Sequence, residues 1–246
     1  MTRDYETPRF PPPETADREG LVSVGGRLTP PWLLTAYRQG IFPWPLLLPD
    51  GYALAWFSPD PRVLLPWETL HIPRRLARRL RRCEFTITCD QAFGDVIQGC
   101  AAPRRTDSVT WITPAVKRAY KTFHELGYAH SIEVWQEDRL VGGLYGVAIG
   151  EYFSGESMFH RVRDASKAAV VALAAHLHRR GFTLFDIQQA TPHMVALGAV
   201  AMPRRQFLRK VREATRQPPR FGTPAEFSQS VAWLVDHLAS RSASPS

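Results

Sequence analysis

The sequence of 246 residues lacks the signatures of several common enzyme classes. It contains no GxxxxGK(S/T) loop, and the glycines at 142–146 do not fit GxGxxG, so no site for a nucleotide is indicated. No cluster of carboxylates accompanies its eight histidines, which argues against a metal centre. We therefore expect a chemistry without ATP, metal or any other cofactor.

Long apolar runs and paired cysteines are missing as well. No apolar run approaches the roughly 18 to 20 residues of a membrane span. The polar opening segment gives no indication of a secretory signal. Cys83, Cys89 and Cys100 are odd in number and form no CxxC pair, which favours free thiols in a reducing compartment. We expect a cytoplasmic protein with no membrane partner, acting as a monomer.

Arginine, by contrast, is abundant and clustered. The net charge is +8, and residues 73–82 read PRRLARRLRR. Leu76 and Leu80 recur at helical spacing, so one narrow stripe can dock while arginine covers the other faces. A second cluster lies at 204–216. A single charge run is most often a solvated surface, but two arginine-rich helices favour a polyanionic partner.

Proline and glycine indicate how the chain is divided. Residues 1–20 form a proline-rich arm, and a short helix is predicted from Thr29 to Gly40. The segment 56–62 is too rich in proline for regular structure, and we place a domain boundary after it. We predict a small N-terminal domain over 1–62 with a loose arm, a catalytic domain over 63–232 and a C-terminal tail over 233–246.

The larger part of the chain alternates strand and helix patterns. Helices are predicted over 90–98, from Thr113 to Gly127, and from Asp164, as the capping residue, to Gly181. Strands are predicted at 85–88 and 182–185, and 131–149 reads as a hairpin. The pattern predicts a mixed α/β (α+β) domain with a largely antiparallel sheet, typical of an acyltransferase-like domain.

Three polar residues interrupt apolar segments. Asp186 and Gln188 end a predicted strand and are expected on one face, because side chains alternate with period two. Glu156 follows another apolar segment, and a carboxylate there is costly to desolvate unless it is paired or useful. An apolar stripe surrounds them, and it reads either as plain core or as a pocket: Leu144, Phe153, Met158, Val170, Leu173, Leu177 and Phe185.

Two alternatives follow from the residues alone. An acyl-CoA N-acyltransferase needs a glycine-rich pyrophosphate loop before a helix, and residues 159–167 contain no glycine. A non-catalytic RNA-binding module fits the arginine content but does not account for Glu156, Asp186 and Gln188.

Ten strings, in order along the chain, carry a resemblance to a known family. They are LLTAYRQGIFPW (33–44), WFSPDPR (56–62), TWIT (110–113), AHSIEVW (129–135), LVGGLYGVAIG (140–150), GESMF (155–159), ASK (165–167), FDIQ (185–188), LGA (197–199) and PRRQF (203–207). Together they resemble leucyl/phenylalanyl-tRNA–protein transferase.

The resemblance implies a small N-terminal domain with a larger acetyltransferase-like (GNAT-like) domain, a function, and roles for residues. It implies transfer of Leu or Phe, and Met less readily, from aminoacyl-tRNA to the N-terminal Lys or Arg of acceptor proteins, marking them for N-end rule degradation. It assigns catalysis to Asp186 and Gln188, acceptor binding to Glu156, and the donor side-chain pocket to the apolar stripe. We expect Asp186 to hold Gln188 and to draw off the proton of the acceptor amine, directly or through Gln188 or water. Aromatic residues near the tRNA's terminal adenosine are implied at Tyr37, Trp44, Trp111 and Tyr120. The arginine helix is expected to bind tRNA phosphates through Arg74, Arg75, Arg78, Arg79 and Arg82.

Overall fold

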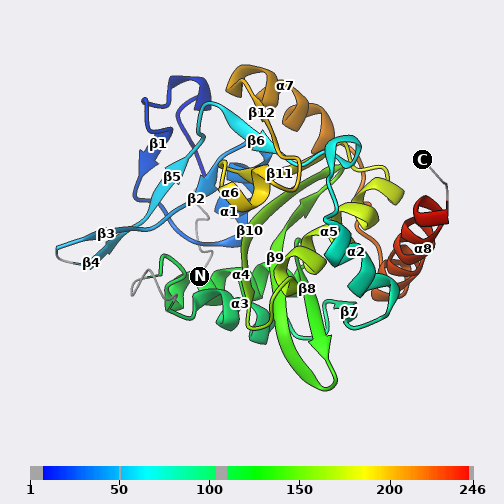
Figure 1. The fold of residues 1–246 in the computed structure, drawn as a ribbon. Helices are drawn as coiled ribbons and strands as arrows, with labels where there is room; N and C mark the ends of the chain where they lie inside the picture. The colour runs from blue at the N-terminus through cyan, green and yellow to red at the C-terminus, as the bar shows by residue number, and fades with distance from the viewer. Residues whose placement is uncertain (1–7, 50, 104–109, 244–246) are drawn as a thin grey trace.

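A seven-stranded mixed sheet forms the centre of the protein (Figure 1). The computed structural model describes residues 8–49, 51–103 and 110–243. In spatial order the strands are β12 (Val200–Met202), β6 (Arg62–Leu64), β11 (Leu184–Gln188), β10 (Tyr152–His160), β9 (Arg139–Ile149), β8 (Ala129–Gln136) and β7 (Thr86–Cys89). Neighbouring strands run antiparallel except β10 and β11, which are parallel. The predicted mixed α/β class with a largely antiparallel sheet is confirmed.

Helices cover both faces of this sheet, and each face has its own apolar core. One core includes residues of α2 (Arg74–Arg81), α5 (Ala165–Arg179) and α8 (Pro224–Ala243). The other includes residues of α1 (Pro30–Arg38), α3 (Phe93–Ala101), α4 (Pro114–Glu125) and α7 (Arg204–Ala214). Tyr152 and Phe153, adjacent on β10, pack into opposite cores, as strand alternation requires.

A smaller sheet lies in the N-terminal part of the chain. Its strand order is β1 (Leu21–Val24), β5 (Ala55–Phe57) and β2 (Phe42–Pro43). The hairpin of β3 (Leu46–Leu48) and β4 (Gly51–Ala53) projects from it in Figure 1. Short 3-10 helices occupy Pro13–Thr15 and Trp67–Thr69, and α6 (Pro192–Val195) follows β11.

Local sequence signals account for several of these elements. The Thr113 side chain accepts a hydrogen bond from the Val116 N–H and so caps α4. Gly127 and Gly181 follow α4 and α5 with φ of 79° and 74°, the left-handed conformation that favours glycine. The predicted hairpin at 131–149 is formed by β8 and β9.

Three local predictions differ from the structure. Segment 56–62 has regular structure at both ends, because β5 includes Trp56 and β6 begins at Arg62. Asp164 precedes α5 but makes no side-chain cap bond; its Oδ2 lies 3.4 Å from Arg75 Nε and 3.6 Å from Arg79 Nη1. The segment from 233, expected as a tail, continues α8 to residue 243 and buries Leu234.

None of the helices in the described part of the chain combines the length and the apolar character needed to cross a membrane.

The separation of β10 from β11 creates the space for a site. The two strands pair only over Tyr152–Ser154 and Leu184–Asp186. Gln188 then adopts a φ of 67°, and the register against β6 shifts between Asp186 and Gln188. The pairing of β10 with β11 ends at Asp186, and the left-handed Gln188, which still pairs with Val63 of β6, lies where the two strands diverge.

Candidate functional site

A cavity of about 230 Å³ occupies the space between the diverging strands. It is lined by residues from β9, β10, α5 and the segment from β11 to α6, with two tryptophans beside it: Trp44, Trp111, Leu144, Tyr145, Gly155, Glu156, Ser157, Met158, Val170, Phe185, Ile187, Gln188, Gln189, Thr191 and Met194. Apolar walls with a few convergent polar groups are the usual form of a small-molecule site.

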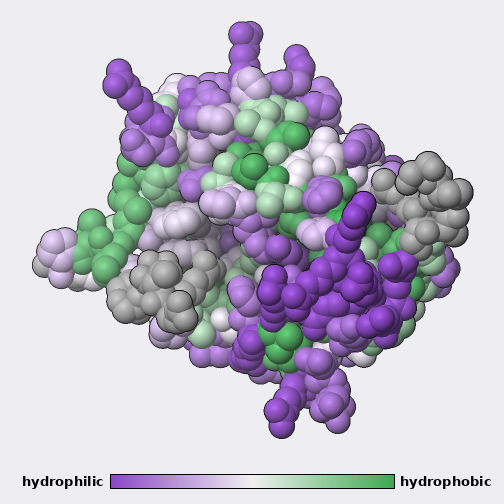
Figure 2. All heavy atoms as spheres, in the orientation of Figure 1, coloured by the Kyte–Doolittle hydropathy of each residue, from purple (hydrophilic) through white to green (hydrophobic). Residues whose placement is uncertain are grey.

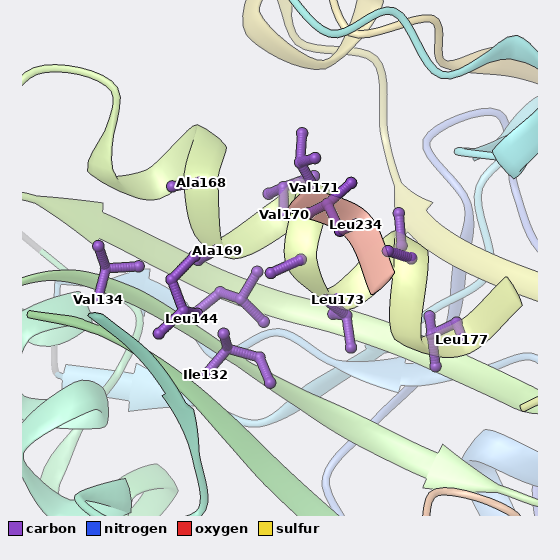
Figure 3. Packing of buried hydrophobic residues seen from close by; sticks show 14 of the residues in the cluster. Ile132, Val134, Leu144, Ala168, Ala169, Val170, Val171, Leu173, Leu177 and Leu234 are labelled. Atoms are coloured by element: carbon purple, nitrogen blue, oxygen red, sulfur yellow. The ribbon is translucent and has the colours of Figure 1, made fainter. Parts of the chain in front are cut away.

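The predicted donor pocket is reproduced only in part. The cavity is lined by Leu144, Met158, Val170 and Phe185. The other predicted members, Phe153, Leu173 and Leu177, are at most 3% exposed and belong to the apolar core. Figure 3 shows Leu173 and Leu177 on the side of α5 that faces the sheet. Two further apolar residues absent from the prediction line the cavity: Ile187, on β11, and Met194, on α6.

Glu156 is the carboxylate of the cavity. Its Oε1 accepts hydrogen bonds from Gln188 Nε2 at 3.0 Å and Ser154 Oγ at 3.1 Å, and its Oε2 accepts one from the Tyr120 hydroxyl at 3.0 Å. Burial raises the pKa of Glu156 to about 7, although the hydrogen bonds from Tyr120 and Ser154 lower it in part. A carboxylate with such a pKa exchanges protons readily at neutral pH.

Asp186 lies behind the cavity and does not line it. It is fully buried, and its oxygens accept hydrogen bonds from Arg62 Nε (2.8 Å), Arg62 Nη2 (2.7 Å), the Tyr152 hydroxyl (2.7 Å) and the Gln188 backbone N–H (2.8 Å). A carboxylate offers about four lone-pair sites. The acceptor capacity of Asp186 is therefore filled. Its contact with Gln188 is made through the Gln188 backbone N–H and not through the Gln188 side chain.

The four predicted adenosine-binding aromatics fall into two groups. Trp44 and Trp111 stack at 5.5 Å between ring centroids, line the cavity and are partly exposed. Tyr37 and Tyr120 are fully buried and joined by a short hydrogen bond between their hydroxyls. Tyr120 donates to Glu156, so this tyrosine pair holds the Glu156 carboxylate in place. Neither tyrosine has an exposed ring face on which the adenine base could stack.

The arginine helix is formed as α2, and a hydrophilic patch covers it in Figure 2. Its arginines are not equivalent. Arg79 is only 12% exposed, pairs with Glu84 at 2.8 Å and stacks on Phe85. Arg75 reaches Asp164 while its side chain stays 60% exposed. The remaining exposed predicted contacts, here called the α2 arginine face, are Arg74, Arg78 and Arg82.

Sequence reasoning missed the residues that hold the polar groups in place. Arg62 and Tyr152 anchor Asp186, and Ser154 bonds Glu156. Ser154 and Glu156 are two residues apart on β10, a spacing that puts both side chains on one face and was a usable signal. Arg62 lies 124 residues from Asp186, and no local pattern connects them.

The site combines an apolar pocket with a carboxylate–amide pair, the arrangement of an enzyme that binds an apolar group and moves a proton beside it. The family model described as leucyl/phenylalanyl-tRNA protein transferase matches residues 64–212, and the model of that family's N-terminal domain matches residues 26–60. The chain belongs to the leucyl/phenylalanyl-tRNA protein transferase family, as the sequence resemblance predicted.

Relatives of the same description cover nearly the whole chain. One from Azoarcus sp. is 49% identical over 94% of this chain and 97% of its own length. One from Nitratidesulfovibrio vulgaris is 51% identical over 87% of this chain and 90% of its own. Among solved structures, a cAMP-binding acyltransferase from Mycobacterium smegmatis has 12% identity over 74% of this chain and 68% of its own, with a TM-score of 0.28, too low to inform the fold.

Proposed function

We propose that the cavity between β10 and β11 holds the leucyl or phenylalanyl group of an aminoacyl-tRNA, and that the chain transfers it to an acceptor protein beginning with Lys or Arg. The observation that carries this proposal is the placement of Glu156 and Gln188 at one end of an apolar cavity. Leu, Phe and, less readily, Met fit walls made of methionine and aliphatic side chains, because such walls discriminate weakly among apolar groups.

The reaction needs a neutral amine, and Glu156 is the group placed to provide it. The acceptor's α-amino group has an ordinary pKa of about 7.7 to 8.0 and is mostly protonated at neutral pH. Glu156, with its pKa raised to about 7 by burial, takes the proton at nearly balanced cost. The amine nitrogen then attacks the ester carbonyl carbon and loses a second proton. The bond to the tRNA's terminal ribose oxygen breaks, and that oxygen takes up this second proton and leaves as the ribose hydroxyl.

Gln188 and Asp186 have different parts in this scheme. The Gln188 amide donates to Glu156 and turns its own carbonyl oxygen toward the attacking amine. Asp186 holds the Gln188 backbone and is a positioning residue, since its four hydrogen bonds leave no room for a further proton. Glu156 is also the one carboxylate among the described cavity-lining residues, and so the candidate contact for a basic first residue.

The tRNA is expected to span the tryptophans and α2. Trp44 and Trp111, which line the cavity and are partly exposed, offer stacking surface for the terminal adenosine. The α2 arginine face binds backbone phosphates without strong sequence preference.

The acceptor product carries a new N-terminal Leu or Phe, which marks it for N-end rule degradation. We retain 1–62 and 63–232 as the working division into N-terminal and catalytic domains.

The test is transfer of radiolabelled Leu from Leu-tRNA to peptides that differ only in their first residue. Peptides beginning with Arg or Lys should become labelled and the Ala peptide should not. Acetyl-CoA with the Arg peptide serves as the matched donor control, and acetylation in place of leucylation would exclude the proposed donor.

A further inference from the structure

Arg62, at the start of β6, is a fully buried arginine outside the cavity. Arginine is almost never fully buried unless it is paired. Burial alone lowers the pKa of Arg62, but the charge of Asp186 beside it raises that pKa well above its usual value. Arg62 is therefore permanently charged, and its burial depends on Asp186.

The guanidinium is fixed from three parts of the chain. Two of its nitrogens bind the two Asp186 oxygens in parallel, at 2.8 and 2.7 Å. Its third nitrogen donates to the Gly40 carbonyl at 3.2 Å. The ring centroids of Phe42 and Phe207 lie 4.9 and 4.5 Å from the guanidinium carbon. Arg62 thus joins the N-terminal sheet, β11 and α7 at one point.

What Arg62 fixes is the geometry at Gln188. The Asp186 oxygen that binds Arg62 Nε also accepts the Gln188 backbone N–H at 2.8 Å. That hydrogen bond holds Gln188 at a φ of 67°, which non-glycine residues seldom adopt unless their surroundings impose it. This backbone conformation places Gln188 Nε2 at 3.0 Å from Glu156 Oε1.

We propose that Arg62 is a positioning residue for aminoacyl transfer, which acts through Asp186 to hold Gln188 in its left-handed conformation against Glu156. The inference rests on the proposed function, because it assumes that Gln188 and Glu156 carry out the transfer. A bidentate pair supplies orientation that a point charge does not.

A purely stabilising role does not explain this choice of residues. Replacing a buried ion pair with well-packed apolar side chains is often neutral or stabilising. An arginine between two phenylalanines could be an apolar side chain if packing were its whole purpose. The feature that an apolar side chain cannot reproduce is a carboxylate held in one orientation beside the Gln188 N–H.

The first test is Arg62→Lys, which keeps the charge near Asp186 and loses the parallel pair of hydrogen bonds. A displacement of about 1 Å at a reacting group can cost on the order of 10²-fold in rate. We expect kcat for Leu transfer to fall by about that factor while the Kd for Leu-tRNA changes less than about threefold. Arg180→Lys, at the partly exposed pair with Glu226, is the control and should leave both constants unchanged.

The second test asks whether Arg62 acts through Asp186. If it does, Arg62→Lys costs no further kcat in an Asp186→Asn background, because two residues that act as a unit are not additive. If the two substitutions together instead lower kcat by the product of their separate factors, the proposal is overturned. A folded Arg62→Lys protein with a lower melting temperature and a kcat within about threefold of wild type would also overturn it.

A third variant covers the case in which Arg62→Lys does not fold. Arg62→Leu with Asp186→Leu removes both charges and should fold, as circular dichroism can verify. Low kcat in that folded protein supports the proposal, and wild-type kcat overturns it. Absence of Leu transfer by the wild-type chain would instead refute the proposed function, so the two failures are distinguishable.

Discussion

The protonation of Glu156 should control the rate of transfer, and its pH dependence can be worked out from the site. With a pKa of about 7, Glu156 is ionised to about 9% at pH 6 and about 91% at pH 8. If the carboxylate is the base, kcat at saturating substrates rises by about tenfold across this interval. Glu156→Gln should lower kcat by about 10² to 10⁴-fold, the usual contribution of a general base, and remove that limb of the profile.

The measurement is kcat against pH with radiolabelled Leu-tRNA and an Arg-initiated peptide. Glu133→Gln is a matched control, because burial also raises the pKa of Glu133, which is bonded to Ser131 and Thr88 away from the cavity. The control should keep the wild-type midpoint. A flat wild-type profile between pH 6 and 8, or a Glu156→Gln enzyme within threefold of wild type, would refute this reasoning.

The remaining predictions concern stability, the donor pocket and the tRNA surface. Folding raises the pKa of Glu156, so the protonated side chain stabilises the folded state. This contribution to stability is fully present below about pH 4.5 and is lost as the pH rises through about 7. Glu156→Gln should therefore melt above wild type at pH 8 and close to it at pH 5. Val170→Ala should shift competition between Leu-tRNA and Phe-tRNA toward Phe by about tenfold. Leu173→Ala, in the core, should cost about 2 to 5 kcal/mol in chemical denaturation and leave that ratio unchanged. Alanine at all three positions of the α2 arginine face should lower the slope of log Kd for tRNA against log salt by about 2, whereas Arg139→Ala, on the β8–β9 hairpin, should not. An unchanged slope would exclude α2 as the phosphate contact.

The elements predicted well from the sequence are those with local signals. The threonine cap and glycine end of α4 lie within one stretch of 15 residues, and the hairpin at 131–149 requires only alternation and a turn. The segment 56–62 was misjudged because its prolines suggested irregular structure, while its ends pair with strands distant in the sequence.

The site was predicted in composition better than in geometry. Period two put Asp186 and Gln188 on one face, but the left-handed turn at Gln188 breaks that period, so Asp186 lies in the core and Gln188 at the cavity. Helical spacing could not separate Val170 from Leu173, because α5 is buried on nearly all sides and its periodicity carries little information.

Charged residues gave the least reliable indications. An arginine following two prolines reads as a surface residue, and the partner that makes Arg62 a core residue is 124 positions away. Arg79 looked equivalent to its neighbours on the arginine helix, yet it pairs with Glu84 and Asp164. Such pairing depends on tertiary contacts that no spacing rule describes.

Transfer of radiolabelled Leu in a single turnover, with enzyme in excess over Leu-tRNA, tests the central claim most directly. We predict label on peptides beginning with Arg or Lys, none on the Ala peptide, and a single-turnover rate that falls by at least about 10²-fold in Glu156→Gln. Equal labelling of the Ala peptide would contradict the proposed acceptor. An undiminished rate in Glu156→Gln would contradict the assignment of the proton to Glu156.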